Sequence, residues 1–247
     1  MRAAVACLCL LVLTGCASPR VPGLAFVMPA IEEPGPAPVA TEPPARDLTT
    51  AVRDGAVRIF GSARLSQGLP AANVGTDGSV GGSPVTVTDV MTGRRVGLGT
   101  TFYDGSFYVD VPVAQGQRAV LVTLDLVDRR SSDRRTSLAA PALLKAGEGE
   151  HQLHVSLGTT VLAAFLSDVA ALQAGRELSD TPLVSPVGGS RELGALIASF
   201  KADDQVKFEG LVASAPELAN PASVEELGAG LRRYGDKLRA SAKKKAL

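Results

Sequence analysis

Residues 84–113, PVTVTDVMTGRRVGLGTTFYDGSFYVDVPV, decide the fold, because turn chemistry and apolar alternation agree along this stretch. Asp104-Gly105 predicts a two-residue hairpin turn, since Gly adopts the positive φ that such a turn needs and Asp tolerates it. Pairing across the turn would place Phe102 opposite Phe107 on an apolar face. The residues expected on the opposite, solvent-facing side are Thr101, Tyr103, Tyr108 and Asp110.

A second turn signal, Thr92-Gly93, precedes the first. A turn there would set Val87 opposite Leu98 and Val85 opposite Thr100, on the same apolar face. The stretch therefore predicts three antiparallel strands with one buried face and one wet face.

Three more stretches alternate in the same way. They are residues 55–65, with Arg58 and Arg64 outward, residues 118–128, and residues 151–157. A long Gly-rich loop, residues 66–82, separates the first strand from the central three. Six strands with turns between them predict an antiparallel β-sandwich of transthyretin-like or immunoglobulin-like type over residues 51–157.

Several short motifs in this region occur in the order of a known family. They are G-x-V at Gly55, G-x-P at Gly68, V-x-V-x-D at Val85, T-G at Thr92 and D-G-x-F at Asp104. Residues 55–157 thus resemble the carboxypeptidase regulatory-like domain. The resemblance implies a non-catalytic, transthyretin-like sandwich of a kind found beside peptidases and on bacterial surfaces.

The amino-terminal residues form a targeting segment. Arg2 is followed by an apolar run, residues 3–13, that is too short to span a bilayer. Leu13-Thr14-Gly15-Cys16 then resembles the bacterial lipobox, which implies removal of residues 1–15 and a lipid anchor on Cys16. All three cysteines lie in this segment, so we expect no disulfide in the folded part. By the same resemblance, Ala17 favours the outer over the inner bacterial membrane.

Residues 16–50 are expected to form a disordered tether, because eight of the sixteen prolines lie between Pro19 and Pro44. Within it, residues 24–31 are unusually apolar. They would either rest on the protein's own domain or dock to a partner.

From residue 158 the apolar period changes to that of helices. Thr159 or Thr160 could cap the first of them, and Val206, Leu211 and Val212 suggest a buried face on a later one. Residues 158–247 are therefore expected to form a small helical appendage. Its last helix ends in Lys243, Lys244 and Lys245, which either complement the helix dipole or contact an anionic surface.

Charge excludes some functions. Lys and Arg number 25, and so do Asp and Glu, so the formal net charge is zero and nothing favours nucleic acid. The repeat Asp128-Arg-Arg-Ser-Ser, Asp133-Arg-Arg-Thr-Ser concentrates charge in one loop. Its arginines either pair locally or bind an anionic partner. The arginines concerned are Arg129, Arg130, Arg134 and Arg135.

Catalytic chemistry is not expected. His151 and His154, the only histidines, would point to opposite faces of a strand, and no serine- or cysteine-hydrolase motif is present. We therefore expect no catalytic residues, no metal and no cofactor. The sequence favours a lipid-anchored envelope protein that presents a protein-binding or structural module. The alternatives are binding of carbohydrate or peptidoglycan through Tyr103 and Tyr108, and service as an accessory domain to a separate peptidase.

Overall fold

The computed structural model of the protein describes residues 54–65, 69, 71–175, 190–200, 202–218 and 221–246, without the side chains of 202–204, 239 and 241–246. The predicted signal peptide, Cys16 and the tether lie outside these residues.

Seven strands form two sheets. The strands are β1 (Ala56–Ala63), β2 (Pro84–Asp89), β3 (Arg95–Thr100), β4 (Ser106–Pro112), β5 (Gln117–Val127), β6 (Arg135–Lys145) and β7 (Glu150–Val155). One sheet has the order β4-β1-β7 and the other the order β3-β2-β5-β6. The fold is thus mainly β, as the sequence predicts.

The two sheets share one hydrophobic core. Alternate residues of β1 and β4, such as Ile59 and Val109, meet alternate residues of β5 and β6, such as Leu124 and Leu138. Burial of this kind stabilises a fold by about 25 cal/mol for each Å² of apolar surface removed from water. The alternation expected for residues 118–128 is confirmed on the core side, where Val120, Val122, Leu124 and Leu126 are buried.

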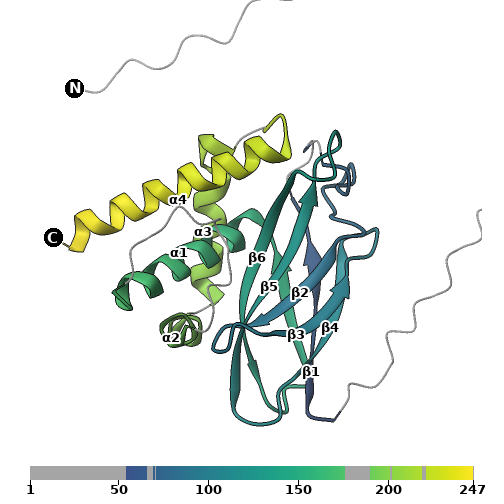
Figure 1. Ribbon diagram of the computed structural model, residues 1–247, viewed down its shortest axis with the longest axis vertical. Helices are drawn as coiled ribbons and strands as arrows, with labels where there is room; N and C mark the ends of the chain where they lie inside the picture. Colours follow the sequence, from purple (N-terminus) through teal and green to yellow (C-terminus); the bar gives the residue numbers. More distant parts are fainter. Residues whose placement is uncertain are drawn as a thin grey trace, which may run out of the picture. The chain divides into compact units, whose positions relative to one another are not determined.

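Helices pack along the β6 side of the sheets (Figure 1), and their apolar residues belong to two hydrophobic cores. The helices are α1 (Leu157–Gln173), α2 (Arg191–Ser199), α3 (Ala202–Ala213) and α4 (Val224–Ala246), with a short 3₁₀ helix η1 (Pro216–Leu218). Helices α1 and α2 form a second core with the four-stranded sheet, where Leu162 and Ile197 meet Leu121 and Ala139. Buried residues of α3, η1 and α4 instead join the core between the sheets. Residues 49–247 make one compact unit, so the helices pack directly on the sheets.

Two expectations about the sheets are wrong. β1 and β7 are parallel, so the arrangement is not purely antiparallel. Strand β6 was not expected at all, and the charged repeat is partly the β5–β6 turn and partly the start of β6. Pro141 lies inside β6 opposite Leu121, which the sheet tolerates because β6 is an edge strand.

The Asp104-Gly105 turn forms, but the hairpin register predicted for it is wrong. Gly105 has a φ of +77° and donates its N–H to the Phe102 carbonyl at 2.9 Å. However, β3 and β4 belong to different sheets, and Phe107 pairs with Gly61 of β1 rather than with Phe102. Thr101 is buried, not solvent-facing, because its hydroxyl accepts the Ser83 N–H at 2.8 Å where the chain crosses between sheets.

The β2–β3 register is displaced from the prediction. Thr86, not Val87, pairs with Leu98, and a bulge lies between Val87 and Thr88. The turn is longer than expected because the Asp89 carboxylate accepts the N–H groups of Met91 and Thr92. As a result Leu98 is 58% exposed.

The helical region follows the prediction in outline only. Ser156, rather than Thr159 or Thr160, caps α1, and its hydroxyl accepts the Thr159 N–H while Thr159 bonds back. Strand β7 therefore ends at Val155, before the expected residue 157. On α3, Val206 is 69% exposed and Leu211 is 47% exposed, whereas Val212 is buried as expected.

Candidate functional site

The outer face of the three-stranded sheet is the best-formed candidate surface. Side chains alternate along strands, so the residues flanking the inward ones point away from the core. The paired registers arrange nine of them in three rows. The rows are Ser106, Ser62 and His154; Tyr108, Phe60 and Gln152; and Asp110, Arg58 and Glu150.

Two aromatic side chains lie at the centre of this face. Phe60 of β1 is 37% exposed, and its cross-strand neighbour Tyr108 of β4 is 42% exposed. The main sheet contacts of the helices are with β5 and β6, and α1 also contacts β7, the strand that precedes it (Figure 1). The Phe60–Tyr108 pair is therefore open to solvent, and we call the nine residues the outer aromatic face.

Arg58 contacts one member of the aromatic pair, Tyr108. Its Nε and Nη2 donate to the two carboxylate oxygens of Asp110 at 2.7 and 3.0 Å, and the residue is only 6% exposed. Its guanidinium lies 5.3 Å from the centroid of the Tyr108 ring, within cation–π range. The hydrogen bond to Asp110 raises the pKa of Arg58, although burial opposes the rise. Tyr108 is thus held against a permanent cation.

The ring neighbour of Tyr108 is Phe102, at 5.8 Å between centroids and 37° between planes. Tyr103 is instead at the tip of the Asp104-Gly105 turn and is 90% exposed. The two tyrosines expected to form a site therefore have different settings. Tyr108 belongs to a packed aromatic group, whereas Tyr103 is a solvent-exposed side chain on a turn.

The histidines lie near this face. His154 shares a 2.9 Å hydrogen bond with the Ser62 hydroxyl, and His151 lies 2.9 Å from the Glu148 carboxylate. Burial raises the pKa of Glu148, but the hydrogen bonds from His151 and from the Lys145 N–H outweigh it, so the pKa lies below its ordinary value. Within the described ranges, no three His, Cys, Asp or Glu residues gather in a way that could hold a metal ion.

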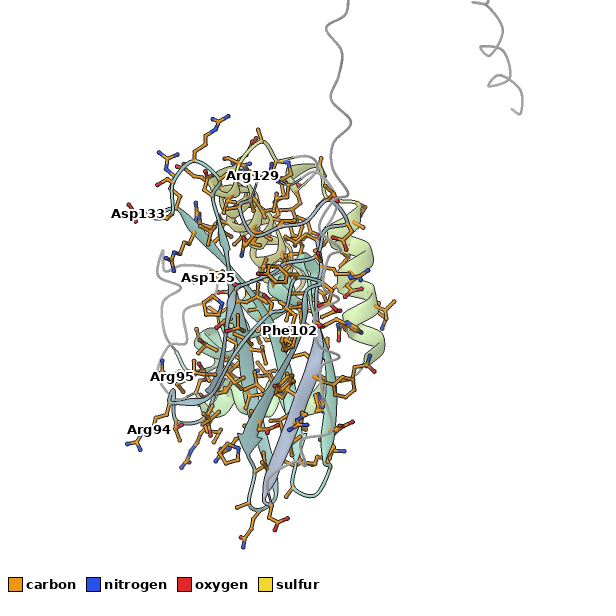
Figure 2. The ribbon with its side chains drawn as sticks, turned by 90° about the vertical axis from the view of Figure 1, so that its right-hand side faces the viewer. Arg94, Arg95, Phe102, Asp125, Arg129 and Asp133 are labelled. Carbon is orange, nitrogen blue, oxygen red and sulfur yellow. The ribbon has the colours of Figure 1, made fainter. Side chains whose placement is uncertain are left out.

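The loop arginines are largely engaged within the protein. Arg134 pairs with Glu225 of α4 at 2.8 Å, Arg129 donates to the Ala71 carbonyl at 2.9 Å, and Arg135 lies 4.0 Å from Asp125. Figure 2 shows Arg129 and Asp133 at one end of the sheets, well away from Arg94 and Arg95. Arg129 and Arg134 thus contact parts of the chain outside the repeat rather than its own aspartates, and binding of an anionic partner by these arginines stays a prediction. The backbone N–H of Arg130 donates to the carboxylate of Asp128.

The structure does not describe the side chains of the remaining predicted residues. Helix α4 includes Lys243, Lys244 and Lys245 in its backbone, but their side chains lie outside the described part, as does Cys16. Their proposed contacts with membrane or anionic polymer stay predictions.

Comparisons with known proteins identify no relative. The chain matches no protein-family model, and a search of curated proteins found no match either. Among the helices of the described residues, none is long and apolar enough to cross a membrane.

Sequence reasoning missed the central residue of the outer aromatic face, Phe60. Its position two residues after the outward Arg58 already places it on the outward side of the strand. The missing information was which strands flank β1. Without the β1–β4 pairing, Phe60 and Tyr108 are 48 residues apart with no sign of proximity.

Proposed function

We propose that the protein is a lipid-anchored, non-enzymatic binding module of the bacterial envelope. Cys16 carries the anchor, residues 16–50 act as a tether, and the anchored membrane is the outer one. The outer aromatic face is the surface that binds. The exposed Phe60–Tyr108 pair, with the buried Arg58 against Tyr108, is the observation that carries this proposal.

A protein partner fits this face best. Aromatic residues and arginine are enriched at the centres of protein interfaces, where a few well-packed side chains supply most of the binding energy. The Arg58–Asp110 pair fixes Tyr108 before binding, so little rotamer entropy is lost on association. The polar neighbours Gln152, Glu150 and His154 would form part of the surrounding polar rim.

We further propose that the two-sheet unit is a transthyretin-like sandwich of the carboxypeptidase regulatory-like type. The motifs at Gly55, Val85 and Asp104 support this assignment, and so does the seven-strand, two-sheet arrangement. On this basis, service beside a separate peptidase is one form that protein binding could take.

Binding of carbohydrate or peptidoglycan is a second candidate. Tyr108 offers a partly exposed ring beside the partly exposed carboxylate of Asp110, an arrangement that suits a stacked sugar. Tyr103 would contribute only if the ligand reached the turn. The basic residues Lys243, Lys244 and Lys245 would add a salt-sensitive contact with anionic polymer or lipid.

The anchor is tested by growing cells with labelled palmitate and comparing the wild type with Cys16→Ala. We expect label in the wild type only. Equal labelling of both proteins would contradict the anchor.

The binding face is tested by affinity purification from envelope extracts. The double variant Phe60→Ala with Tyr108→Ala should lose a specific protein partner by at least about tenfold, since hot-spot truncation costs about 2 kcal/mol or more. Leu98→Ala, an exposed apolar residue of β3, is the matched control and should retain it. If no protein partner is found, and the wild type but not the double variant sediments with purified peptidoglycan, the second candidate is favoured.

A further inference from the structure

A cavity of about 380 Å³ lies where the end of β1, the start of α1 and the end of α3 meet, and its lining includes none of the nine residues of the outer aromatic face. Its volume falls in the range of small-molecule sites. Most of its wall is apolar and consists of Leu65, Leu157, Val212, Ala213, Ala215 and Leu218. Its polar side chains are Arg64, Ser156 and Glu209.

Glu209 is held at the amino terminus of α1. Its carboxylate oxygen Oε1 lies 3.3 Å from the hydroxyl of Ser156, the helix cap. Gly158 permits this approach, because a β-carbon there would lie 2.5 Å from Glu209 Cγ. The first turn of α1 contains no acidic residue, so Glu209 provides the negative charge that a helix amino terminus favours. The cavity therefore has one anionic group, on an exposed residue that contacts the helix cap.

Arg64 provides a cationic group in the same cavity. It follows β1 directly, its N–H donates to the Val155 carbonyl at 3.2 Å, and the residue is exposed. Among the described residues, neither Arg64 nor Glu209 lies within ion-pair distance of an opposite charge, although Arg64 acts electrostatically on the Asp77 carboxylate and helps to lower its pKa. The nearby acid Asp77 is already bonded to the hydroxyl and N–H of Ser79.

We propose that this cavity binds a small zwitterion with an apolar side chain, namely an apolar amino acid or a dipeptide. The carboxylate of the ligand would bind Arg64, whose guanidinium suits a bidentate contact. The ammonium group would bind Glu209, and the apolar side chain would occupy the wall formed by Leu65 and Val212. A wholly apolar ligand would leave both charged groups without a partner on the ligand. A ligand with a single charge would be repelled by one of the two groups.

The test is calorimetric titration of the full chain with leucine and, separately, with alanyl-leucine. We expect at least one of the two to bind, and the comparison identifies which. N-acetylleucine lacks the ammonium group and leucinamide lacks the carboxylate, so each should bind at least tenfold more weakly than leucine. Equal binding of N-acetylleucine and leucine, or no binding of either zwitterion, would overturn the proposal.

Variants locate the site. Arg64→Gln and Glu209→Gln should each weaken binding at least tenfold, whereas Arg94→Gln, on the β2–β3 turn and not part of the cavity lining, should leave it unchanged. Ala213→Trp provides a check that does not depend on charge, because Ala213 is exposed at the cavity and a large side chain there would fill it. This variant should lose binding at an unchanged melting temperature. Wild-type affinity in both charge variants would rule the site out.

Discussion

Gly105 is required by its backbone conformation and by its surroundings together. Its φ is +77°, and a β-carbon there would lie 2.5 Å from the Ala63 carbonyl oxygen and 3.1 Å from the Val80 nitrogen. Gly116 has a similar φ of +66° but no atom within 4 Å of such a β-carbon. Substitutions at the two glycines can therefore be compared to separate the cost of backbone strain from the cost of steric contact.

We predict that Gly105→Ala destabilises the protein clearly more than Gly116→Ala. Each change incurs the cost of a left-handed conformation, about 1–2 kcal/mol. Only Gly105→Ala also forces the turn away from β1. Thermal unfolding should show a larger fall in melting temperature for Gly105→Ala, where each kcal/mol corresponds to about 2–4 °C in a protein of this size. Equal melting temperatures would mean that the turn does not pack against Ala63.

Asp77 should make stability depend on acid pH. The hydroxyl of Ser79 donates to its carboxylate at 2.6 Å and the Ser79 N–H at 3.1 Å, and these bonds lower the pKa of Asp77 below its ordinary value of 3.8. Because the folded-state pKa is depressed, the stabilisation is present above the unfolded-state pKa and is lost as pH falls through the folded-state pKa.

The matching experiment compares Asp77→Asn with the wild type across pH. The wild type should melt at the higher temperature above about pH 5, where an unfolded-state Asp is ionised. The difference should shrink steadily below pH 4. A difference that is constant from pH 7 to pH 2 would show that ionisation of Asp77 plays no part.

At the level of elements, local signals were sufficient for most strands and for the Asp104-Gly105 turn, but not for the pairing of β3. The decisive residues there are glycines. A β-carbon on Gly97 or Gly99 would lie 2.7 Å from a methyl group of Val109, so the bare backbone of β3 packs against β4 across the layer. Glycine carries no hydrophobic pattern, and Leu98 suggested the wrong inward face.

Strand β6 was missed for a related reason. Its residues are buried on both faces, with Leu138 toward the other sheet and Ala139 toward α1, so the period-2 pattern is absent. Its alanines and Pro141 also disfavour a strand by composition. Both errors come from long-range packing, which decides inward faces where side chains are small.

Two glycines of helix α4 should change the free energy of unfolding in opposite directions when each is replaced by alanine. Glycine inside a helix usually costs about 1 kcal/mol relative to alanine. A β-carbon on Gly230 would lie 2.3 Å from the Glu217 carbonyl oxygen, whereas one on Gly235 meets nothing within 4 Å. Gly235→Ala should therefore raise the free energy of unfolding by up to about 1 kcal/mol, and Gly230→Ala should lower it.

Denaturant unfolding measures both changes. The ion pair between Lys237 and Glu217 also holds α4 to η1, so displacement of the helix by Gly230→Ala should weaken that contact as well. If both variants gain stability, α4 does not pack on η1 as described.

At the scale of the whole molecule, the two sheets and the helices form layers, and the two sheets are covered to different extents. The four-stranded sheet is covered on one face by the other sheet and on the opposite face by helices. The three-stranded sheet is covered on its inner face and presents Phe60 and Tyr108 outward. The sequence predicted a binding module and one of these aromatics, Tyr108. The face itself depends on bringing β1, β4 and β7 together, which no local signal specifies.

Site-specific photocrosslinking in the native envelope tests the role of this face most directly. A photoreactive phenylalanine analogue is placed at Phe60, at Tyr108, or at the exposed control position Leu98 on β3. We predict a shared, discrete adduct from Phe60 and Tyr108 that is absent from Leu98. The same adducts from all three positions, or an adduct from Leu98 alone, would contradict the assignment of the outer aromatic face as the binding surface.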